Sequence, residues 1–480
     1  MKKIMWILAL AFLQSCKKTF IELNPESTAS TNAVYKTDKD FQDAVIGIYS
    51  TTQSIYQSFW QFGDLAGDDT EQQHSAQLEF VNINNFLATS ATPLLHTTWL
   101  DHYRAIFRAN TVLSQIDKAD PAVVTDKNRH IGEAKFLRAL AYFNLVRIFG
   151  DVPMVTAPIT IEEASKTGRE KVDKIYDEII IKDLLDADNK LPLKYSGTLV
   201  GKATKGAAKA LLGKVYLTRK DFANTVTKLQ EVTTLGYSLL PNYNDLFDYT
   251  KDEHHAEYLF DIEYTDGGLG LGSTFTNNFA PNLSGVVNFF SLKGSGGQQG
   301  APTLPIFALF EANDKRKDIS VAKVADGLID KNGQKIPLIP IDVTTYSKKY
   351  MTPLQTANDS KANWKVIRYA DVLLMYAEAL NETGKTDLAL PFLNQVRARA
   401  GVPPYPVLTQ TDTREKIYLE RRLELHLEGH RWFDLVRTGR ALSVLQSQGM
   451  KSYMTVFPIP LSQIQVINNP AIFPQNPGYN

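Results

Sequence analysis

Apolar residues recur at helical spacing through much of the chain, and they predict a mainly helical protein. The clearest pattern runs over residues 131–149, where Leu137 and Leu145 belong to one apolar stripe and phenylalanines widen it. Gly150 follows directly, as is typical of the residue after a helix. Shorter stretches with the same spacing predict further helices at 39–57, 99–116, 171–191 and 414–438.

Two pairs of predicted helices share one pattern of small and aromatic residues. The first pair covers 205–218 and 222–235, and the second covers 369–382 and 387–400. Helix pairs of this kind resemble tetratricopeptide units, which must stack on neighbours to bury their apolar faces. Because the two pairs lie far apart in the sequence, we expect separate units packed into one body. The predicted fold class is mostly α, with a scaffold of tetratricopeptide-like helical hairpins.

The composition changes between the two pairs, over about 241–362. Gly, Asn, Ser, Phe and Pro accumulate there, so helices are not expected and short strands are predicted at 258–264 and 335–341. We therefore expect one body, residues 37–480, with a helical scaffold at 37–240 and 363–440 and an irregular, loop-rich insertion. Insertions of this kind on a helical scaffold are common sites of binding.

Residues 1–15 have the pattern of a lipoprotein signal peptide. Two lysines precede ten apolar residues at 4–13, a stretch too short to span a bilayer. Leu-Gln-Ser-Cys then resembles a bacterial lipobox, and the only cysteine in the chain, Cys16, stands where the chain would be cut and lipidated. A plain secretory signal with an incidental cysteine is the alternative. Residues 16–36 are polar and are expected to form an extended tether.

Composition and charge narrow the function. Hydrophobic residues make up 44% of the 480 residues and charged residues 22%, as in ordinary folded proteins. Lys and Arg together number 52, as do Asp and Glu, so no net positive charge favours nucleic-acid binding. No apolar run approaches the ~20 residues of a membrane-spanning helix, which excludes a polytopic membrane protein. We expect a protein that is anchored to a membrane by covalently attached lipid.

Sequence signatures of catalysis and of metal binding are incomplete. His426, Glu428 and His430 lack the H-E-x-x-H spacing of zinc proteases, and residues 197–202 fall one residue short of a phosphate-binding loop. No G-x-S-x-G motif is present. We therefore expect no catalytic residue, no metal and no cofactor. The Glu and Arg residues of 420–437 are better explained as a charged, partly buried helix pair.

Four stretches together resemble the SusD/RagB family of outer-membrane lipoproteins of Bacteroidetes. They are GEAKFLRALAYFNLVRIFGDVP at 132–153, IRYADVLLMYAEA at 367–379, ERR with EGHRWFDL within 420–435, and QNPGY at 475–479. With the lipobox, the similarity runs from one end of the chain to the other in the order of the family. This agrees with the mostly helical fold class expected from the periodicity.

The resemblance implies a function. Members of the family are cell-surface lipoproteins that capture glycans, in some cases peptides, and each acts as the lid of a SusC-like TonB-dependent transporter. No catalysis is implied. Surface export is often associated with acidic residues soon after the lipidated cysteine, whereas Lys17 and Lys18 follow Cys16 here. A lipid-anchored glycoside hydrolase and a helical-repeat scaffold that binds only proteins are the alternatives.

Ligand-binding residues do not carry over by motif, so we infer candidates from sugar chemistry. Sugars offer apolar ring faces and a hydroxyl rim, which favours exposed aromatic rings beside polar side chains. The first set lies where residues 59–63 are expected to form a loop: Phe59, Trp60, Asp68, Asp69 and Gln72. The second set lies in the insertion: Tyr264, Phe275, Asn277, Asn278, Phe289 and Phe290.

Each candidate has a structural alternative. Burial in the core is the alternative for every aromatic side chain, and Trp99, Trp364 and Trp432 are assigned to the core because they lie on or beside regular helices. Asp68 and Asp69 are also the best carboxylate pair for glycoside hydrolysis. The alternative for this pair is two solvated loop carboxylates, or acceptors for sugar hydroxyls.

Overall fold

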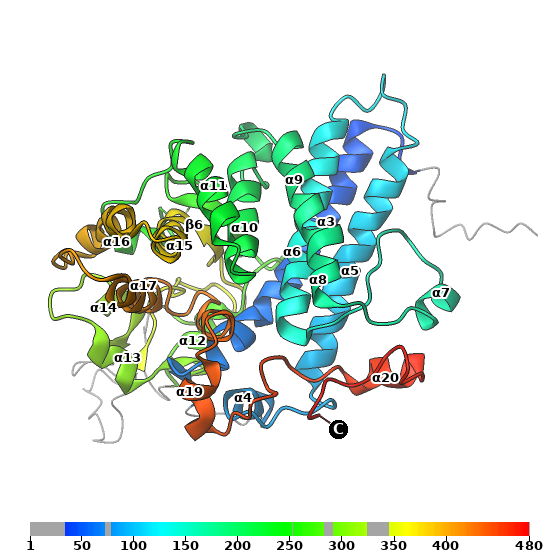
Figure 1. Ribbon diagram of the computed structural model, residues 1–480. Coiled ribbons are helices and arrows are strands. Elements are labelled where there is room, and N and C mark those ends of the chain that lie inside the picture. The colour runs from blue at the N-terminus through cyan, green and yellow to red at the C-terminus, as the bar shows by residue number, and fades with distance from the viewer. Residues whose placement is uncertain (1–33, 73–77, 252, 283–290, 324–344, 480) are drawn as a thin grey trace, which may run out of the picture.

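The computed structural model describes residues 34–72, 78–251, 253–282, 291–323 and 345–479, and helices dominate it (Figure 1). Cys16, Phe289, Phe290 and the strand predicted at 335–341 lie outside these residues. The helices are α3 (Asp38–Trp60), α4 (Leu78–Asn84), α5 (Pro93–Ile116), α6 (Lys127–Phe149), α7 (Ile161–Ser165), α8 (Val172–Ile175), α9 (Ile181–Lys190), α10 (Lys205–Thr218), α11 (Phe222–Thr233), α12 (Phe275–Phe279), α13 (Leu304–Leu309), α14 (Lys317–Ser320), α15 (Tyr369–Glu382), α16 (Thr386–Ala400), α17 (Gln410–Glu424), α18 (Arg431–Arg437), α19 (Ala441–Leu445) and α20 (Leu461–Ile467).

Three long helices, α3, α5 and α6, pack side by side and form one end of the molecule (Figure 1). Thr37 caps α3 in a reciprocal arrangement with Asp40, because each side chain accepts from the backbone N–H of the other. Helix α6 is buried on both faces, as its phenylalanines predict, and it ends at Gly150, whose φ of +74° favours glycine. These three helices position the N-terminal half of the chain.

The two helical hairpins, α10–α11 and α15–α16, pack against each other through α11 and α15. The two hairpins are therefore neighbours in space, although they lie far apart in the sequence. A buried carboxylate fastens them, since Asp371 of α15 pairs with Lys214 of α10 at 2.8 Å and with Arg421 of α17 at 2.8 Å. Within the first hairpin the helices approach closely at Gly213, where an added Cβ would stand 2.2 Å from Leu229.

The described residues form three antiparallel pairs of short strands, and the insertion contributes at least one strand to each: β1 (Thr70–Glu71) with β3 (Ala301–Pro302), β2 (Tyr258–Ile262) with β6 (Trp364–Arg368), and β4 (Ala322–Lys323) with β5 (Thr345–Tyr346). The strand predicted at 258–264 is thus confirmed as β2. The expectation of no helices is wrong, because α12, α13 and α14 lie there. Local capping explains α13, whose first turn contains Pro305 and is capped by the Thr303 hydroxyl.

The loop expected at residues 59–63 does not exist. Helix α3 continues to Trp60 and passes directly into a π-helix, η2 (Gln61–Leu65), whose residues are all buried. Gly63 suggested a break, but it has a packing role: an added Cβ would stand 2.4 Å from the Gly429 Cα. The backbone of residues 425–430 therefore lies directly against this helix.

The helix expected at 414–438 is divided into α17 and α18. Leu427 and Gly429 between them adopt φ of +56° and +81°, which a helix does not permit. One hydrophobic cluster includes side chains from both the helical scaffold and the insertion. Trp99, Trp364 and Trp432 belong to it, which confirms their assignment to the core. None of the described helices is both long and apolar enough to cross a membrane.

Candidate functional site

The two aromatic residues of the first candidate set are buried. Trp60 has no exposed surface and packs edge-on against Phe80 and Phe279, with ring centroids 5.7 and 5.2 Å away. Phe59 is 5% exposed and stacks on Phe433 at 5.5 Å. Their burial is a consequence of the helix that replaces the expected loop, because this helix turns both rings toward the core. Their contact with a ligand stays a prediction, and here neither ring offers a free face.

The described members of the second set are also mostly enclosed. Tyr264 and Phe275 are buried and pack edge-on at 5.5 Å. Asn277 donates from Nδ2 to the backbone carbonyls of Lys293 and Ser295, at 2.8 and 3.1 Å, so it organises the local loop. Asn278 is half-buried, and its Nδ2 donates to the side-chain oxygen of Thr274 at 2.8 Å.

Folding nevertheless brings the two sets together. Phe279 lies between them, edge-on to Trp60 and stacked on Phe275 with centroids 5.9 Å apart. Tyr350 and Trp364 extend the same cluster, with rings 5.3 Å apart and nearly parallel. These aromatic side chains join helix α3 to the insertion, so their plain role in this structure is to fix the insertion on the scaffold.

Asp68 and Asp69 are ion-paired and not solvated. Arg422 contacts both carboxylates, and Arg431 donates to Asp68 at 2.7 Å. Burial by itself would raise the pKa of both carboxyl groups. The hydrogen bond and charge of Arg431 outweigh burial and hold the pKa of Asp68 below its ordinary value, whereas for Asp69 burial prevails and its pKa is raised. Gln72, the last candidate of the first set, is half-buried, and its backbone N–H donates to Asn84.

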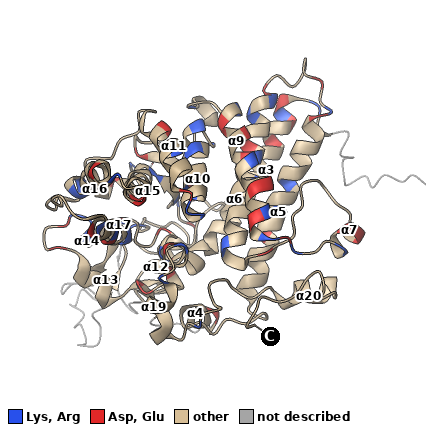
Figure 2. Ribbon diagram, viewed as in Figure 1, with Lys and Arg blue, Asp and Glu red and all other residues tan. Residues whose placement is uncertain are grey.

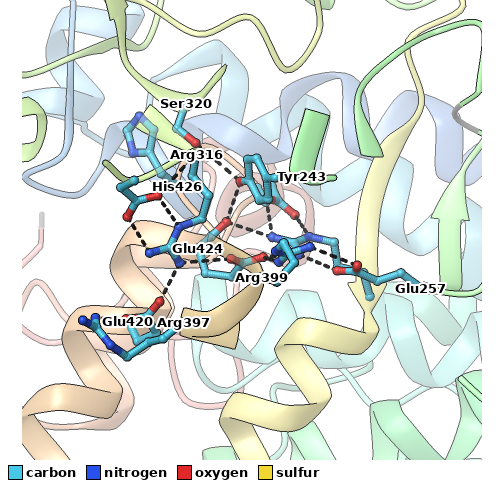
Figure 3. Close-up of polar contacts among 12 residues, drawn as sticks. Tyr243, Glu257, Arg316, Ser320, Arg397, Arg399, Glu420, Glu424 and His426 are labelled. Carbon is cyan, nitrogen blue, oxygen red and sulfur yellow. Dashed lines mark hydrogen bonds and ion pairs between the residues drawn. The ribbon is translucent and has the colours of Figure 1, made fainter. Parts of the chain in front are cut away.

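Of the Glu and Arg residues of 420–437, Glu420 and Glu424 belong to a buried charge network (Figure 3). Glu424 lies at its centre and pairs with Arg316 of the insertion, with Arg368 at the end of β6 and with Arg399 of α16. Arg316 also pairs with Glu420 at 2.6 Å. The structural interpretation of the charges is thus confirmed. Their main partners come from distant segments, which spacing along one helix could not indicate.

Charged residues elsewhere are interspersed in sign over the helices (Figure 2). Within the described part of the chain, no group of three or more His, Cys, Asp or Glu side chains is arranged to hold a metal ion. His254 contacts Glu263, and His255 accepts from the backbone N–H of Glu257.

Two larger hollows remain as candidate binding surfaces. The first, which we call the apolar groove, has a volume of about 1060 Å³ and lies between α5, the segment 153–167 and α20. Its lining is dominated by side chains such as Phe107, Ile161 and Val466, which suit an apolar partner better than a sugar.

The second hollow has a volume of about 1340 Å³, and we call it the tyrosine pocket. It lies where the loop between α9 and α10 meets the end of α11 and the start of β2. Its aromatic side chains are Tyr195, Tyr237 and Tyr258, and polar groups lie among them. The sequence analysis missed this pocket, because its walls come from segments with no common motif. The turn glycines Gly201 and Gly236, the second directly before Tyr237, were the only local signal.

Comparison with known proteins agrees with this architecture. The sequence model described as "SusD family" matches residues 342–451, and the one described as "Starch-binding associating with outer membrane" matches residues 19–217. A solved "Laminarin binding SusD-like protein" superposes with a TM-score of 0.79 at 29% identity, over 93% of this chain and all of that one. The chain belongs to the SusD family.

Further relatives share most or nearly all of the length of this SusD-like chain. "SusD-like protein P2" of Formosa agariphila is 28% identical over 99% of both chains. The "Starch-binding protein SusD" of Bacteroides thetaiotaomicron is 24% identical over 76% of this chain and 75% of its own. A surface glycan-binding protein A in complex with laminarihexaose superposes with a TM-score of 0.77 at 22% identity, covering 92% of this chain and 99% of that one. At that identity the likeness concerns the fold.

Proposed function

We propose that this protein is a cell-surface lipoprotein of the outer membrane that captures oligosaccharides and delivers them to a SusC-like TonB-dependent transporter, acting as its lid. The observation that carries the proposal is similarity along nearly the whole chain to SusD-like proteins. One of them is named for laminarin binding and shares 29% identity and the fold. Glycan binding is the better supported part, and the transporter partner follows from the family.

Two structural features support binding without hydrolysis. Asp68 and Asp69, the best carboxylate pair for glycoside cleavage, are each engaged by arginines. A carboxylate held by two guanidinium groups is a poor nucleophile, since its charge is already compensated. The buried charge network and the aromatic cluster also fix the insertion on the scaffold, which suits a protein that presents a preformed surface.

The lipid anchor belongs to the same proposal. Cys16 precedes Val34, the first described residue, by 18 residues. Such a segment spans up to ~60 Å when extended. A lid on a tether of this length can move relative to a barrel in the same membrane and still remain attached to it. Acyl chains on Cys16 would supply durable membrane attachment.

Purification from native outer membranes tests the proposal. The tagged protein is extracted in mild detergent, and co-purification of a large β-barrel in near-equal amount is expected. A Cys16→Ala variant is the matched control, and it should leave the membrane fraction. Recovery of the lipidated protein without any barrel would contradict the lid model.

Incubation with oligosaccharides separates binding from hydrolysis. Laminarihexaose and maltohexaose are incubated with the pure protein, and the products are separated by chromatography. We expect both hexasaccharides to remain uncleaved. Shorter products that disappear in an Asp69→Asn variant would favour the hydrolase instead.

A further inference from the structure

The tyrosine pocket is built from three segments that are distant in sequence. The loop of residues 193–204 forms one wall, residues 234–237 after α11 form a second, and residues 254–259 at the start of β2 form the third. Each wall contributes one half-buried tyrosine: Tyr195, Tyr237 and Tyr258. Half-buried aromatic rings around a hollow of this size are the arrangement that sugar rings require.

Each of the three tyrosines is fixed in position by its hydroxyl group or its ring. The Tyr195 hydroxyl donates to Glu133 at 3.4 Å, and the Tyr258 hydroxyl donates to Glu263 at 3.0 Å. Tyr237 stacks on Tyr369, with ring centroids 6.2 Å apart and planes inclined by 28°. Rings that are held in this way lose little conformational entropy when a ligand binds, so the pocket is preorganised.

Glycines allow two of these groups to approach the backbone closely. Gly206 lies under Tyr237, where an added Cβ would stand 2.2 Å from the phenolic oxygen. Gly201 has φ of +92°, and an added Cβ there would stand 2.3 Å from a carboxylate oxygen of Glu263. By contrast, no atom lies within 4 Å of the Cβ position at Gly236, which faces open space. The shape of the hollow therefore depends on glycine at positions 201 and 206, where any side chain would overlap a neighbour.

The charges around the pocket are balanced in pairs. His254 contacts Glu263 with a nitrogen–oxygen distance of 2.6 Å, and this hydrogen bond raises the pKa of the histidine. Lys202 pairs with Glu133 at 3.3 Å. Two ion pairs leave Lys194 as the one lining cation without an ion pair among the described residues. Such a pocket has little net charge, which favours a neutral ligand over a polyanion.

Polar groups of both kinds are available beside the rings. The Glu263 carboxylate accepts hydrogen bonds and is about two-fifths exposed, whereas Lys194 donates. Sugar hydroxyls both donate and accept, so they match this mixture.

We propose that the tyrosine pocket binds a neutral oligosaccharide of the laminarin or starch class, with sugar rings against Tyr195 and Tyr237 and hydroxyl groups at Glu263. The assignment rests on the proposed function, since it places glycan capture at a named surface. The apolar groove fits a sugar less well, because its lining offers few polar groups to hydrogen-bond with the sugar hydroxyls. None of the described residues in the two candidate sets is part of the lining of this pocket.

Affinity electrophoresis in gels that contain laminarin or starch tests the site. The variants are Tyr195→Ala with Tyr237→Ala, Glu263→Gln, and Thr234→Trp, which fills the pocket from an exposed position and loses the hydrogen bond from the Thr234 hydroxyl to the Glu231 carbonyl. Loss of two stacking rings should weaken binding about tenfold, because each contributes about 0.5–1.5 kcal/mol. Tyr249→Ala is the matched control, since this exposed tyrosine does not line the pocket.

The outcomes separate the site from the function. Retardation of the wild type and of Tyr249→Ala, with loss in the double variant and in Thr234→Trp, supports the site. Equal retardation of the wild type and Thr234→Trp overturns the tyrosine pocket and leaves the proposed function standing. Failure of the wild type to be retarded by either glycan overturns both. Thermal unfolding by circular dichroism confirms that each variant is folded, and Thr234→Trp keeps the test valid if the double variant is not.

Discussion

Replacement of Arg316 by methionine should strongly destabilise the protein. The guanidinium has no exposed surface, and it donates to both oxygens of Asp314 at 2.9 and 2.7 Å. It also pairs with Glu420 at 2.6 Å and with Glu424 at 3.1 Å. Methionine has a similar length but no charge, so the change removes the interactions with little change in volume.

The size of the effect follows from what each carboxylate retains. Glu420 keeps Arg397 at 3.0 Å, and Glu424 keeps Arg368 and Arg399. Asp314 is 5% exposed and loses its ion pair, keeping the backbone N–H of residue 316, so its buried charge is no longer compensated. Breaking a buried ion pair from one side costs about 3–5 kcal/mol. We expect a loss of this order in the free energy of unfolding.

Urea unfolding followed by circular dichroism measures the change. Lys348→Met is the matched control, because it removes an ion pair with Asp318 that is largely exposed, and exposed pairs contribute about 0–1 kcal/mol. Adding Asp314→Asn to Arg316→Met should recover part of the loss, since it removes the unpaired charge. A loss below about 1 kcal/mol for Arg316→Met, equal to that of the control, would refute the reasoning.

Two further predictions follow from the same segment. Glu428 is buried, and although burial raises its pKa, Arg368 and Lys349 lower it from an ordinary value of 4.5 to about 2. A carboxyl group whose pKa is lowered by folding stabilises the fold at pH values above its pKa in the unfolded state. Stability should therefore fall as the pH drops from about 5 to 2, and Glu428→Gln should flatten that part of a stability–pH curve. Gly63→Ala should lower the thermal midpoint, because its Cβ would overlap Gly429, whereas Gly47→Ala on the preceding helix α3 meets only an ordinary contact at 3.8 Å and should be neutral or stabilising. Equal midpoints for the two alanine variants would contradict the close approach.

The helical scaffold was largely predictable. Periodicity gave α6, α10 and α15 with bounds close to those observed, since each buries a continuous apolar face. The prediction failed at residues 59–63, where Gly63 was interpreted as a break in the helix. Glycine there permits contact with the backbone near Gly429, a residue more than 360 positions later in the chain. A local pattern carries no information about so distant a neighbour.

The candidate site was less predictable for the same reason. Aromatic residues that stack on sugars and aromatic residues that fill a core look alike in a sequence, and Trp60 and Phe275 belong to the core here. Asp68 and Asp69 appeared as free carboxylates because Arg422 and Arg431 are more than 350 residues away. The tyrosine pocket escaped notice since its three walls, at 193–204, 234–237 and 254–259, are not contiguous and share no spacing.

The sequence by itself determined the class of fold, the positions of most helices, the resemblance to the SusD family and the candidate lipid anchor. These depend on local periodicity, on contiguous motifs and on one cysteine, all of which are properties of neighbouring residues. Only the tertiary structure decided which aromatic rings are buried, which charges neutralise one another and where a hollow lies. Those properties depend on the distances between segments that the chain brings together only when it folds, and burial and electrostatic energy are functions of those distances.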